Sequence, residues 1–121
     1  LLANSGGPGR WRGGLGQEVE VEVTTDDPVR LALISDRMKH PAGGLAGGRA
    51  GAPAKVALQD GTTPHPKGRT TLPPGARLTM HYGGGGGVGD PGQRDPAALS
   101  RDIEAGYVTP EGARRDYGAK E

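Results

Sequence analysis

A run of five consecutive glycines, residues 83–87, constrains this chain more than any other feature. The whole chain carries 24 glycines and 11 prolines among 121 residues, a composition for which low complexity or disorder is an alternative to a folded domain. The formal net charge of +1, however, lacks the repulsion typical of disordered chains. Because the chain has no phenylalanine and one tryptophan, we expect it to complete its core against upstream sequence or a partner subunit.

The absence of cysteine excludes a disulfide framework and any thiolate nucleophile or metal ligand. No apolar run approaches the roughly 20 residues that span a bilayer, and no signal peptide is visible. We therefore expect a cytoplasmic protein without a membrane partner.

Alternation predicts the first two strands. Over residues 17–24 valines alternate with glutamates, and residues 29–34 again place apolar side chains on one face. Turn-forming residues 25–28 lie between the two runs. The pattern predicts an antiparallel hairpin in which Arg30 pairs with a glutamate across the strands.

The middle of the chain contains fewer regular elements. Residues 35–53 are rich in glycine and proline and predict a long irregular loop. Short strands are expected at residues 55–58 and 77–82, with a turn at Asp60-Gly61 between them.

Two short helices are predicted at the end of the chain. Asp95 and Pro96 suit the cap and first position of one helix, which Gly106 ends. Thr109 and Pro110 repeat the same start.

The second helix has further signals at both ends. Val108 can pack against Ala113 one turn later, and Gly118 ends the helix. The sequence thus predicts an α+β protein: a small antiparallel β-sheet with long glycine-rich loops, followed by two short helices. Residues 1–94 would form the β-rich segment and residues 95–121 a helical tail docked on it.

The glycine run has three interpretations. Its backbone N–H groups could cradle a phosphate, but the Gly-Asp-Pro that follows lacks the lysine of a phosphate loop, and Asp90 would repel the anion. A tight corner that brings backbones close and needs positive φ is the interpretation we favour. A backbone surface lining a substrate pocket remains the third. The corner consists of Gly84, Gly85, Gly86, Gly87, Gly89 and Asp90.

Arg10-Trp11-Arg12 places two guanidinium groups around an indole ring. The three residues could bind a carboxylate, a phosphate or a stacked base. Alternatively, Trp11 is a packing anchor and the arginines pair with acids. The motif occurs once in a chain of nearly balanced charge, so nucleic acid is not expected as a partner.

The three histidines do not predict a metal site, because none has a second ligand at a characteristic spacing. They are His40, His65 and His81. His40, with Asp36 and Arg37 close by in the long loop, is the best candidate for a binding site, although a solvated loop histidine is the simpler interpretation.

Two longer motifs lie near the two ends of the chain. The first is Ser-Gly-Gly-Pro-Gly-Arg-Trp-Arg-Gly-Gly-Leu-Gly at residues 5–16. The second begins with the glycine run and Gly-Asp-Pro, continues with Arg-Asp-Pro at residues 94–96, and ends with Tyr-Gly at residues 117–118. Both motifs resemble the hydantoinase B / 5-oxoprolinase family, which also contains the large subunits of acetone and acetophenone carboxylases. Such enzymes are much longer, so the resemblance covers their C-terminal segment only.

The resemblance implies an activity for the parent protein. Similar proteins use ATP to open a cyclic amide, such as hydantoin or 5-oxoproline, or to carboxylate a ketone. The segment would belong to the subunit that handles the small cyclic-amide substrate, together with its upstream part and an actin-like, ATP-binding hydantoinase A-type subunit or domain. It would bind no cofactor itself, whereas ATP and a divalent metal are implied for the full complex.

No catalytic residue of the family can be placed on this chain. Candidate substrate-binding residues are Arg10, Trp11, Arg12, Asp36, Arg37 and His40. Val88 stands where relatives carry an aromatic residue in the glycine corner. Two hypotheses follow: a C-terminal segment of an ATP-dependent cyclic-amide hydrolase that is inactive alone, or a non-catalytic binding or assembly module derived from that fold.

Overall fold

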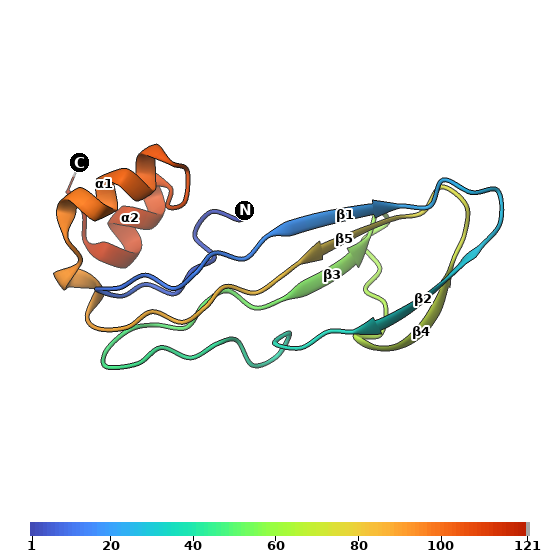
Figure 1. Ribbon diagram of the computed structural model, residues 1–121, viewed down its shortest axis with the longest axis horizontal. Helices are drawn as coiled ribbons and strands as arrows, with labels where there is room; N and C mark the ends of the chain where they lie inside the picture. Colours follow the sequence, from blue (N-terminus) through green and yellow to red (C-terminus); the bar gives the residue numbers. More distant parts are fainter. Residues whose placement is uncertain (121) are drawn as a thin grey trace.

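The computed structural model describes residues 1–120. Its elements in chain order are β1 (Glu18–Glu22), β2 (Val29–Ile34), β3 (Lys55–Leu58), β4 (Lys67–Leu72), β5 (Arg77–His81), the 3-10 helix η1 (Pro91–Gln93), α1 (Pro96–Glu104) and α2 (Pro110–Tyr117). Figure 1 shows an elongated molecule with the helices at one end, the strands at the other and long extended segments between them. The predicted α+β class is confirmed.

The strands form two antiparallel sheets, in the orders β1-β5-β3 and β2-β4. The predicted hairpin of the first two strands is therefore wrong: Val21 lies opposite Leu78 of β5, and Arg30 lies opposite Thr71 of β4. Alternation fixes which face of a strand is buried, but it does not specify the partner strand. A glutamate–cation pair across strands does form, between Glu22 and Arg77 at 3.7 Å.

Strand β4 was not predicted from the sequence. Its residues, Lys-Gly-Arg-Thr-Thr-Leu, include one large apolar side chain, that of Leu72, which is buried. A strand with so little apolar alternation resembles a loop in sequence. Its partner β2 determines its conformation, through a register that runs from Val29 opposite Leu72 to Ile34 opposite Lys67.

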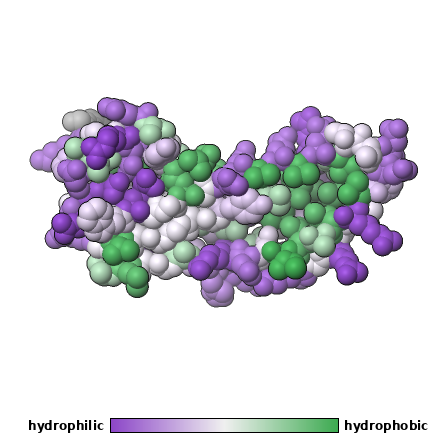
Figure 2. All heavy atoms as spheres, in the orientation of Figure 1, coloured by the Kyte–Doolittle hydropathy of each residue, from purple (hydrophilic) through white to green (hydrophobic). Residues whose placement is uncertain are grey.

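The apolar core at the strand end consists of two small clusters. One contains Val23, Leu72 and Ala76, and the other contains Leu33, Val56 and Leu78. Leu31 and Leu58 pack against both clusters and join them. Figure 2 shows apolar surface gathered over the strands, whereas the helical end is mostly hydrophilic.

The extended segments between the two ends pack side by side without forming β-strands. We call them the glycine bundle: residues 5–17, 42–53 and 82–89. Along the third segment every third N–H donates to the first: Tyr82 to Gln17, Gly85 to Gly14 and Val88 to Trp11, each at 2.9 Å. A three-residue repeat matches the three residues per turn of a polyproline II helix, which forms no hydrogen bonds within itself and leaves its N–H groups available to neighbouring segments.

A second series of hydrogen bonds from the same segment reaches another side of the glycine bundle. The N–H groups of Gly84 and Gly87 donate to the carbonyl groups of Ala52 and Arg49, at 3.2 and 2.9 Å. A Cβ atom on Gly84 would overlap the carbonyl group of Ser5. A Cβ atom on Gly86 or Gly87 would likewise overlap a backbone carbonyl group, so only glycine fits at these three positions, as at the axis of collagen.

The two helices begin and end as the sequence predicts. Asp95 caps α1 by accepting a hydrogen bond from the N–H of Ala97, and Gly106 follows the helix with φ of 73°. Thr109 caps α2 through the N–H of Gly112 at 3.0 Å, and Gly118 ends it in the left-handed conformation.

The helices are joined to each other and to the start of the chain. Val108 packs with Ala113 and Leu99 in a third buried cluster. Asn4 accepts a hydrogen bond from the N–H of Thr109 at 3.0 Å, which ties α2 to the N-terminal segment. Over residues 1–120, no helix is both long enough and apolar enough to span a bilayer.

Candidate functional site

A buried cluster of charges joins the glycine bundle to the helices. Arg12 binds the carboxylate of Asp102 on α1 in a bidentate manner, with Nε–Oδ2 and Nη2–Oδ1 distances of 3.0 and 3.1 Å. Arg94 binds the same carboxylate, with an Nη2–Oδ2 distance of 2.6 Å. The side chains of Arg12, Asp102 and Arg94 are 15, 9 and 10 % exposed, respectively. We call these residues the Arg12–Asp102–Arg94 cluster.

Two positive charges in this cluster face one negative charge. Burial disfavours the charged form of Asp102, but the hydrogen bonds and charges of both arginines outweigh it, so its pKa lies below the usual 3.8. A carboxylate held in this way has its acceptor positions occupied by guanidinium groups. The cluster therefore suits a structural or positioning role better than direct acid–base chemistry.

Tyrosine rings cover both arginines. The guanidinium carbon of Arg12 lies 5.6 Å from the ring centre of Tyr107, and that of Arg94 lies 6.0 Å from the ring centre of Tyr117. Burial raises the pKa of the Tyr117 hydroxyl, although the positive charges of Arg94 and Arg12 act to lower it. Among residues 1–120, neither this buried hydroxyl nor the buried Nε of Arg94 has a hydrogen-bond partner.

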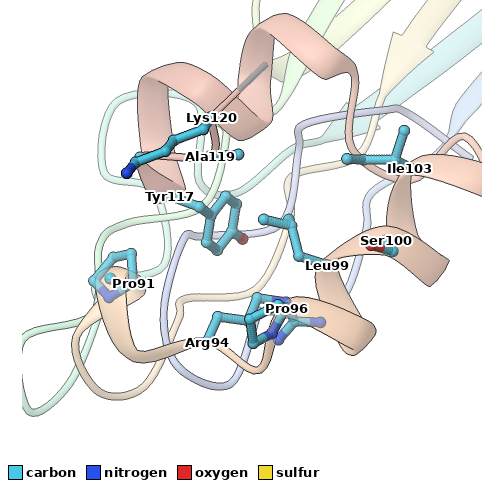
Figure 3. Close-up of a pocket in the computed structure, with 11 residues that line it drawn as sticks. Pro91, Arg94, Pro96, Leu99, Ser100, Ile103, Tyr117, Ala119 and Lys120 are labelled. Atoms are coloured by element: carbon cyan, nitrogen blue, oxygen red, sulfur yellow. The ribbon is translucent and has the colours of Figure 1, made fainter.

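A cavity of about 430 Å³ lies beside Tyr117, between η1, α1 and the end of α2. Figure 3 shows Tyr117, Leu99 and Ile103 on its walls, with Arg94 beside Pro96 at its base. Small-molecule sites have this apolar lining with few polar groups. The volume lies within the range of small-molecule sites, about 300 to 1,000 Å³.

Arg10 and Trp11 lie next to the glycine corner. Trp11 pairs with Val88 in an antiparallel bridge, and Arg10 donates its N–H to the carbonyl of Gly89 at 3.2 Å. Trp11 is nevertheless 65 % exposed, so it is not a packing anchor within the described residues. The guanidinium carbon of Arg10 lies 5.7 Å from its ring centre. An acid partner for both arginines was one of the two interpretations of the motif. The structure gives one to Arg12, and within residues 1–120 none is within ion-pair distance of Arg10.

The glycine corner uses its own backbone donors. The N–H groups of Gly84, Gly85, Gly87 and Gly89 donate to carbonyl groups of neighbouring segments. They are therefore not free to cradle a phosphate. Within the corner, Gly89 has a positive φ of 78°. A Cβ atom on Gly84, Gly86 or Gly87 would overlap a neighbouring backbone carbonyl group.

Two further corner residues have structural contacts. A Cβ atom on Gly86 would overlap the carbonyl group of Gly43 from the second segment of the glycine bundle. The carboxylate of Asp90 accepts a hydrogen bond from the N–H of Gly92 at 2.8 Å and so caps η1. Both contacts lie within the fold and leave the corner closed to a ligand on these sides.

The other predicted site residues lie elsewhere. Asp36, Arg37 and His40 follow β2 and line a separate cleft near the sheets, together with His65 and Lys67. In Figure 1 the segment after β2 is well removed from the helices along the long axis. The structure therefore does not bring these three residues together with Arg10, Trp11 and Arg12.

The residues that pair with Arg12 and with Asp36 were not identified from the sequence. Asp102 lies 90 residues after Arg12, and no local pattern links the two. Arg94 and Tyr117 were noted only as parts of the family motif. Lys67 was overlooked because β4 itself was not predicted.

A family model described as Hydantoinase B/oxoprolinase matches residues 1–91. This match covers most of the chain, and the chain belongs to the hydantoinase B/oxoprolinase family. It corresponds to the C-terminal segment of its relatives. The resemblance noted from the two sequence motifs is thus confirmed.

Similar proteins include enzyme subunits of known name. The caprolactamase subunit beta of Pseudomonas jessenii is 33 % identical over 135 residues, which cover 98 % of this chain and 22 % of that protein. An uncharacterized protein of Methanocaldococcus jannaschii is 32 % identical over 123 residues, covering 99 % of this chain and 22 % of the relative. The chain thus spans about a fifth of the length of these relatives.

Two solved structures share the fold. In the crystal structure of the ATP-dependent caprolactamase from Pseudomonas jessenii, the match has a TM-score of 0.74 at 28 % identity and covers 98 % of this chain and 22 % of that chain. The match to the nucleotide-free structure of acetone carboxylase also has a TM-score of 0.74, at 24 % identity. It covers 98 % of this chain and 20 % of the acetone carboxylase chain. At that identity the second match supports the fold alone.

Proposed function

We propose that this chain is the C-terminal part of the substrate-handling subunit of an ATP-dependent hydrolase that opens a cyclic amide, hydantoin or 5-oxoproline. The similarity to the caprolactamase subunit beta over 98 % of the chain carries this proposal. Caprolactam is itself a cyclic amide. An unstrained amide is a poor electrophile, so phosphorylation of its oxygen by ATP would supply a leaving group that water can displace.

The partner in this proposal is an actin-like, ATP-binding subunit or domain of the hydantoinase A type. ATP would be bound there and not by this segment. The family resemblance also implies a divalent metal. Among residues 1–120 no three His, Asp or Glu side chains gather in a way that could hold a metal ion. The residues of this segment thus do not fit a metal site, and we derive no step through a metal.

Within the segment, the six candidate substrate-binding residues would have different roles. Arg10 and Trp11 present an exposed cation and an exposed aromatic ring, which could contact the planar amide group of a cyclic amide. Arg12 is engaged with Asp102, so its role would be to position the loop. Asp36, Arg37 and His40 would act in the separate cleft. We further propose residues 1–94 and 95–121 as the two structural parts of the segment.

A chimeric enzyme tests the proposal. The C-terminal segment of the caprolactamase subunit beta is replaced by this chain, and the subunit is produced with the other caprolactamase subunit. We expect ATP-dependent ring opening of caprolactam, hydantoin or 5-oxoproline above the level of a subunit that lacks the segment. A chimera that assembles to the native size but opens none of the three rings would contradict the proposal.

One observation favours the alternative, a binding or assembly module without catalysis. Val88 forms β-bridges with both Trp11 and Leu45, so the three residues lie side by side. The exposed fractions of Val88, Trp11 and Leu45 are 40, 65 and 69 %, respectively. A contiguous exposed apolar row marks an interaction surface. An autonomous module should unfold cooperatively when the 121-residue chain is heated alone, whereas a segment that completes its core elsewhere should not.

A further inference from the structure

The cleft near the sheets has two walls that the β2-β4 register holds together. β2 ends at Ile34, which lies opposite Lys67 at the start of β4. One residue further on, the N–H of Ser35 donates to the carbonyl of Pro66 at 2.8 Å. The segment after β2 therefore faces the segment before β4. Between them is a cleft of about 530 Å³, which we call the β2–β4 cleft.

Among the charged side chains that line the β2–β4 cleft, cations outnumber anions, while much of the remaining lining is apolar. Its charged and ionisable groups are Asp36, Arg37, Lys39, His40, His65 and Lys67. Figure 2 shows hydrophilic residues gathered along the same edge of the molecule, beside the end of β2. The whole chain is nearly neutral, with a formal net charge of +1, so this is a local excess of positive charge.

The single carboxylate in the lining is already paired. Asp36 Oδ1 accepts a hydrogen bond from Lys67 Nζ at 2.8 Å. Arg37 and Lys39 have no carboxylate within ion-pair distance among residues 1–120. Two full positive charges thus face the cleft region unmatched, which favours an anion.

The backbone of Arg37 has a defined conformation. Arg37 adopts φ of 60°, a conformation that non-glycine residues seldom hold, and such outliers concentrate at binding and catalytic sites. Its carbonyl accepts a hydrogen bond from the N–H of Ala54 at 3.0 Å, just before β3. The loop that carries Arg37 is therefore anchored at the point of the strained residue.

His65 has a defined hydrogen-bonding role. Its Nδ1 accepts a hydrogen bond from the N–H of Lys67 at 3.1 Å, so the proton of the neutral ring resides on Nε2. Nε2 is then a donor. Beside it, Met38 and Pro66 add apolar surface to the cleft lining, which could contact the carbon skeleton of an organic ligand.

We propose that the β2–β4 cleft binds a compact anion that carries at least two negative charges, a phosphate group or a dicarboxylate. Arg37 supplies a planar guanidinium for bidentate contact, Lys39 supplies an ammonium group, and His65 supplies Nε2–H. The site rests on these residues alone. It holds whether or not the parent protein opens a cyclic amide.

The test uses the ¹⁵N-labelled 121-residue chain, titrated with inorganic phosphate or succinate at constant ionic strength, with sodium chloride as the baseline. We expect saturable shifts of the amide signals of residues 35–40 and 65–67. Arg37→Gln should weaken binding by about tenfold or more, whereas Arg69→Gln, an equal loss of charge on β4 outside the cleft, should not. Saturation by phosphate alone would assign a phosphate ligand, and saturation by both would extend the site to dicarboxylates.

Equal weakening by Arg37→Gln and Arg69→Gln would overturn the proposal, because it would indicate general charge attraction. Shifts no larger than those with chloride would overturn it too. If the isolated chain lacks a dispersed amide spectrum, the same variants are compared by calorimetry in the chimeric subunit beta. Loss of one phosphate-binding event in Arg37→Gln alone is then the supporting result, and no difference between the variants is the contrary one.

Ring-opening activity of the same chimeras separates this site from the proposed function. A chimera that opens the ring but shows no anion binding would contradict the cleft alone. A chimera that binds the anion but opens no ring would contradict the hydrolase alone.

Discussion

Arg12 and Asp102 are 90 residues apart in the chain, and their side chains form a bidentate ion pair with N–O distances of 3.0 and 3.1 Å. Through this pair the glycine bundle is attached to α1. Arg94 contributes a third buried charge to the same carboxylate. The attachment of the helical end therefore depends strongly on Asp102.

Replacing Asp102 should loosen the helical end. Asp102→Asn leaves two largely buried guanidinium groups without a counter-charge, and breaking a buried pair in this way costs about 3 kcal/mol. In the chimeric subunit, amide hydrogen exchange over α1 and α2 should accelerate by roughly 100-fold. Asp26→Asn, in an exposed turn, is the control, and equal exchange in both variants would exclude the proposed attachment.

The same carboxylate makes the helical end sensitive to acid. The folded-state pKa of Asp102 is lowered, because the arginine hydrogen bonds and charges outweigh the opposing effect of burial. Its stabilising contribution is thus fully present above the unfolded value of 3.8 and is lost as the pH falls through the lower folded pKa.

We expect exchange of the α1 amides, corrected for the intrinsic chemical rate, to accelerate below about pH 4. Asp102→Asn should remove this pH dependence. Asp36→Asn is the matched control: hydrogen bonding to Lys67 lowers the pKa of Asp36 too, but this carboxylate is exposed to solvent, which screens the interaction. Retained acid sensitivity in Asp102→Asn would show that another group is responsible.

Two glycine-to-alanine substitutions test whether close backbone packing, and not the loss of a glycine in itself, determines the stability of the glycine bundle. Gly84→Ala places a Cβ atom against the carbonyl group of Ser5, whereas Gly14→Ala meets no atom within 4 Å. Because backbone atoms cannot move aside as a flexible side chain can, Gly84→Ala should destabilise the glycine bundle by about 3 kcal/mol or more. Gly14→Ala should change stability by less than about 1 kcal/mol.

Hydrogen exchange of the glycine-bundle amides in the chimera measures both effects. The N–H of Gly85, which donates to Gly14, is the most direct reporter. Similar exchange rates in the two variants would contradict the backbone-packed arrangement.

Tyr117→Phe should be neutral or stabilising. The buried hydroxyl of Tyr117 has no hydrogen-bond partner within the part of the chain that the structure describes, and such a group costs about 1 kcal/mol or more to keep from water. The ring of phenylalanine would still cover Arg94. Slower exchange of the α2 amides is the expected result; faster exchange would reveal a partner for the hydroxyl outside residues 1–120.

Local signals allowed the helical end to be predicted from the sequence. Asp95 and Thr109 cap helices through hydrogen bonds within a few residues, so their effect is readable without knowledge of the fold. Strand partners were not predictable in this way. The valines of β1 identify a buried face but not that β5, more than fifty residues later, covers it.

The glycine bundle and the candidate binding regions depend on contacts distant in sequence. The run at residues 83–87 indicates close approach, but not that residues 5–17 and 42–53 supply the neighbouring backbones. Likewise, the prediction of Arg37 and His40 as binding residues did not include Lys67, whose position follows from the β2-β4 register. The sequence showed separate parts of each site, and the fold determines which parts meet.

The most direct test of the central claim is to read the coding DNA around this chain. Our account predicts an open reading frame that continues upstream of Leu1 for several times the length of this segment, next to a gene for an actin-like ATPase. A start codon at or just before Leu1, with no such neighbour, would contradict the assignment as part of a hydrolase subunit.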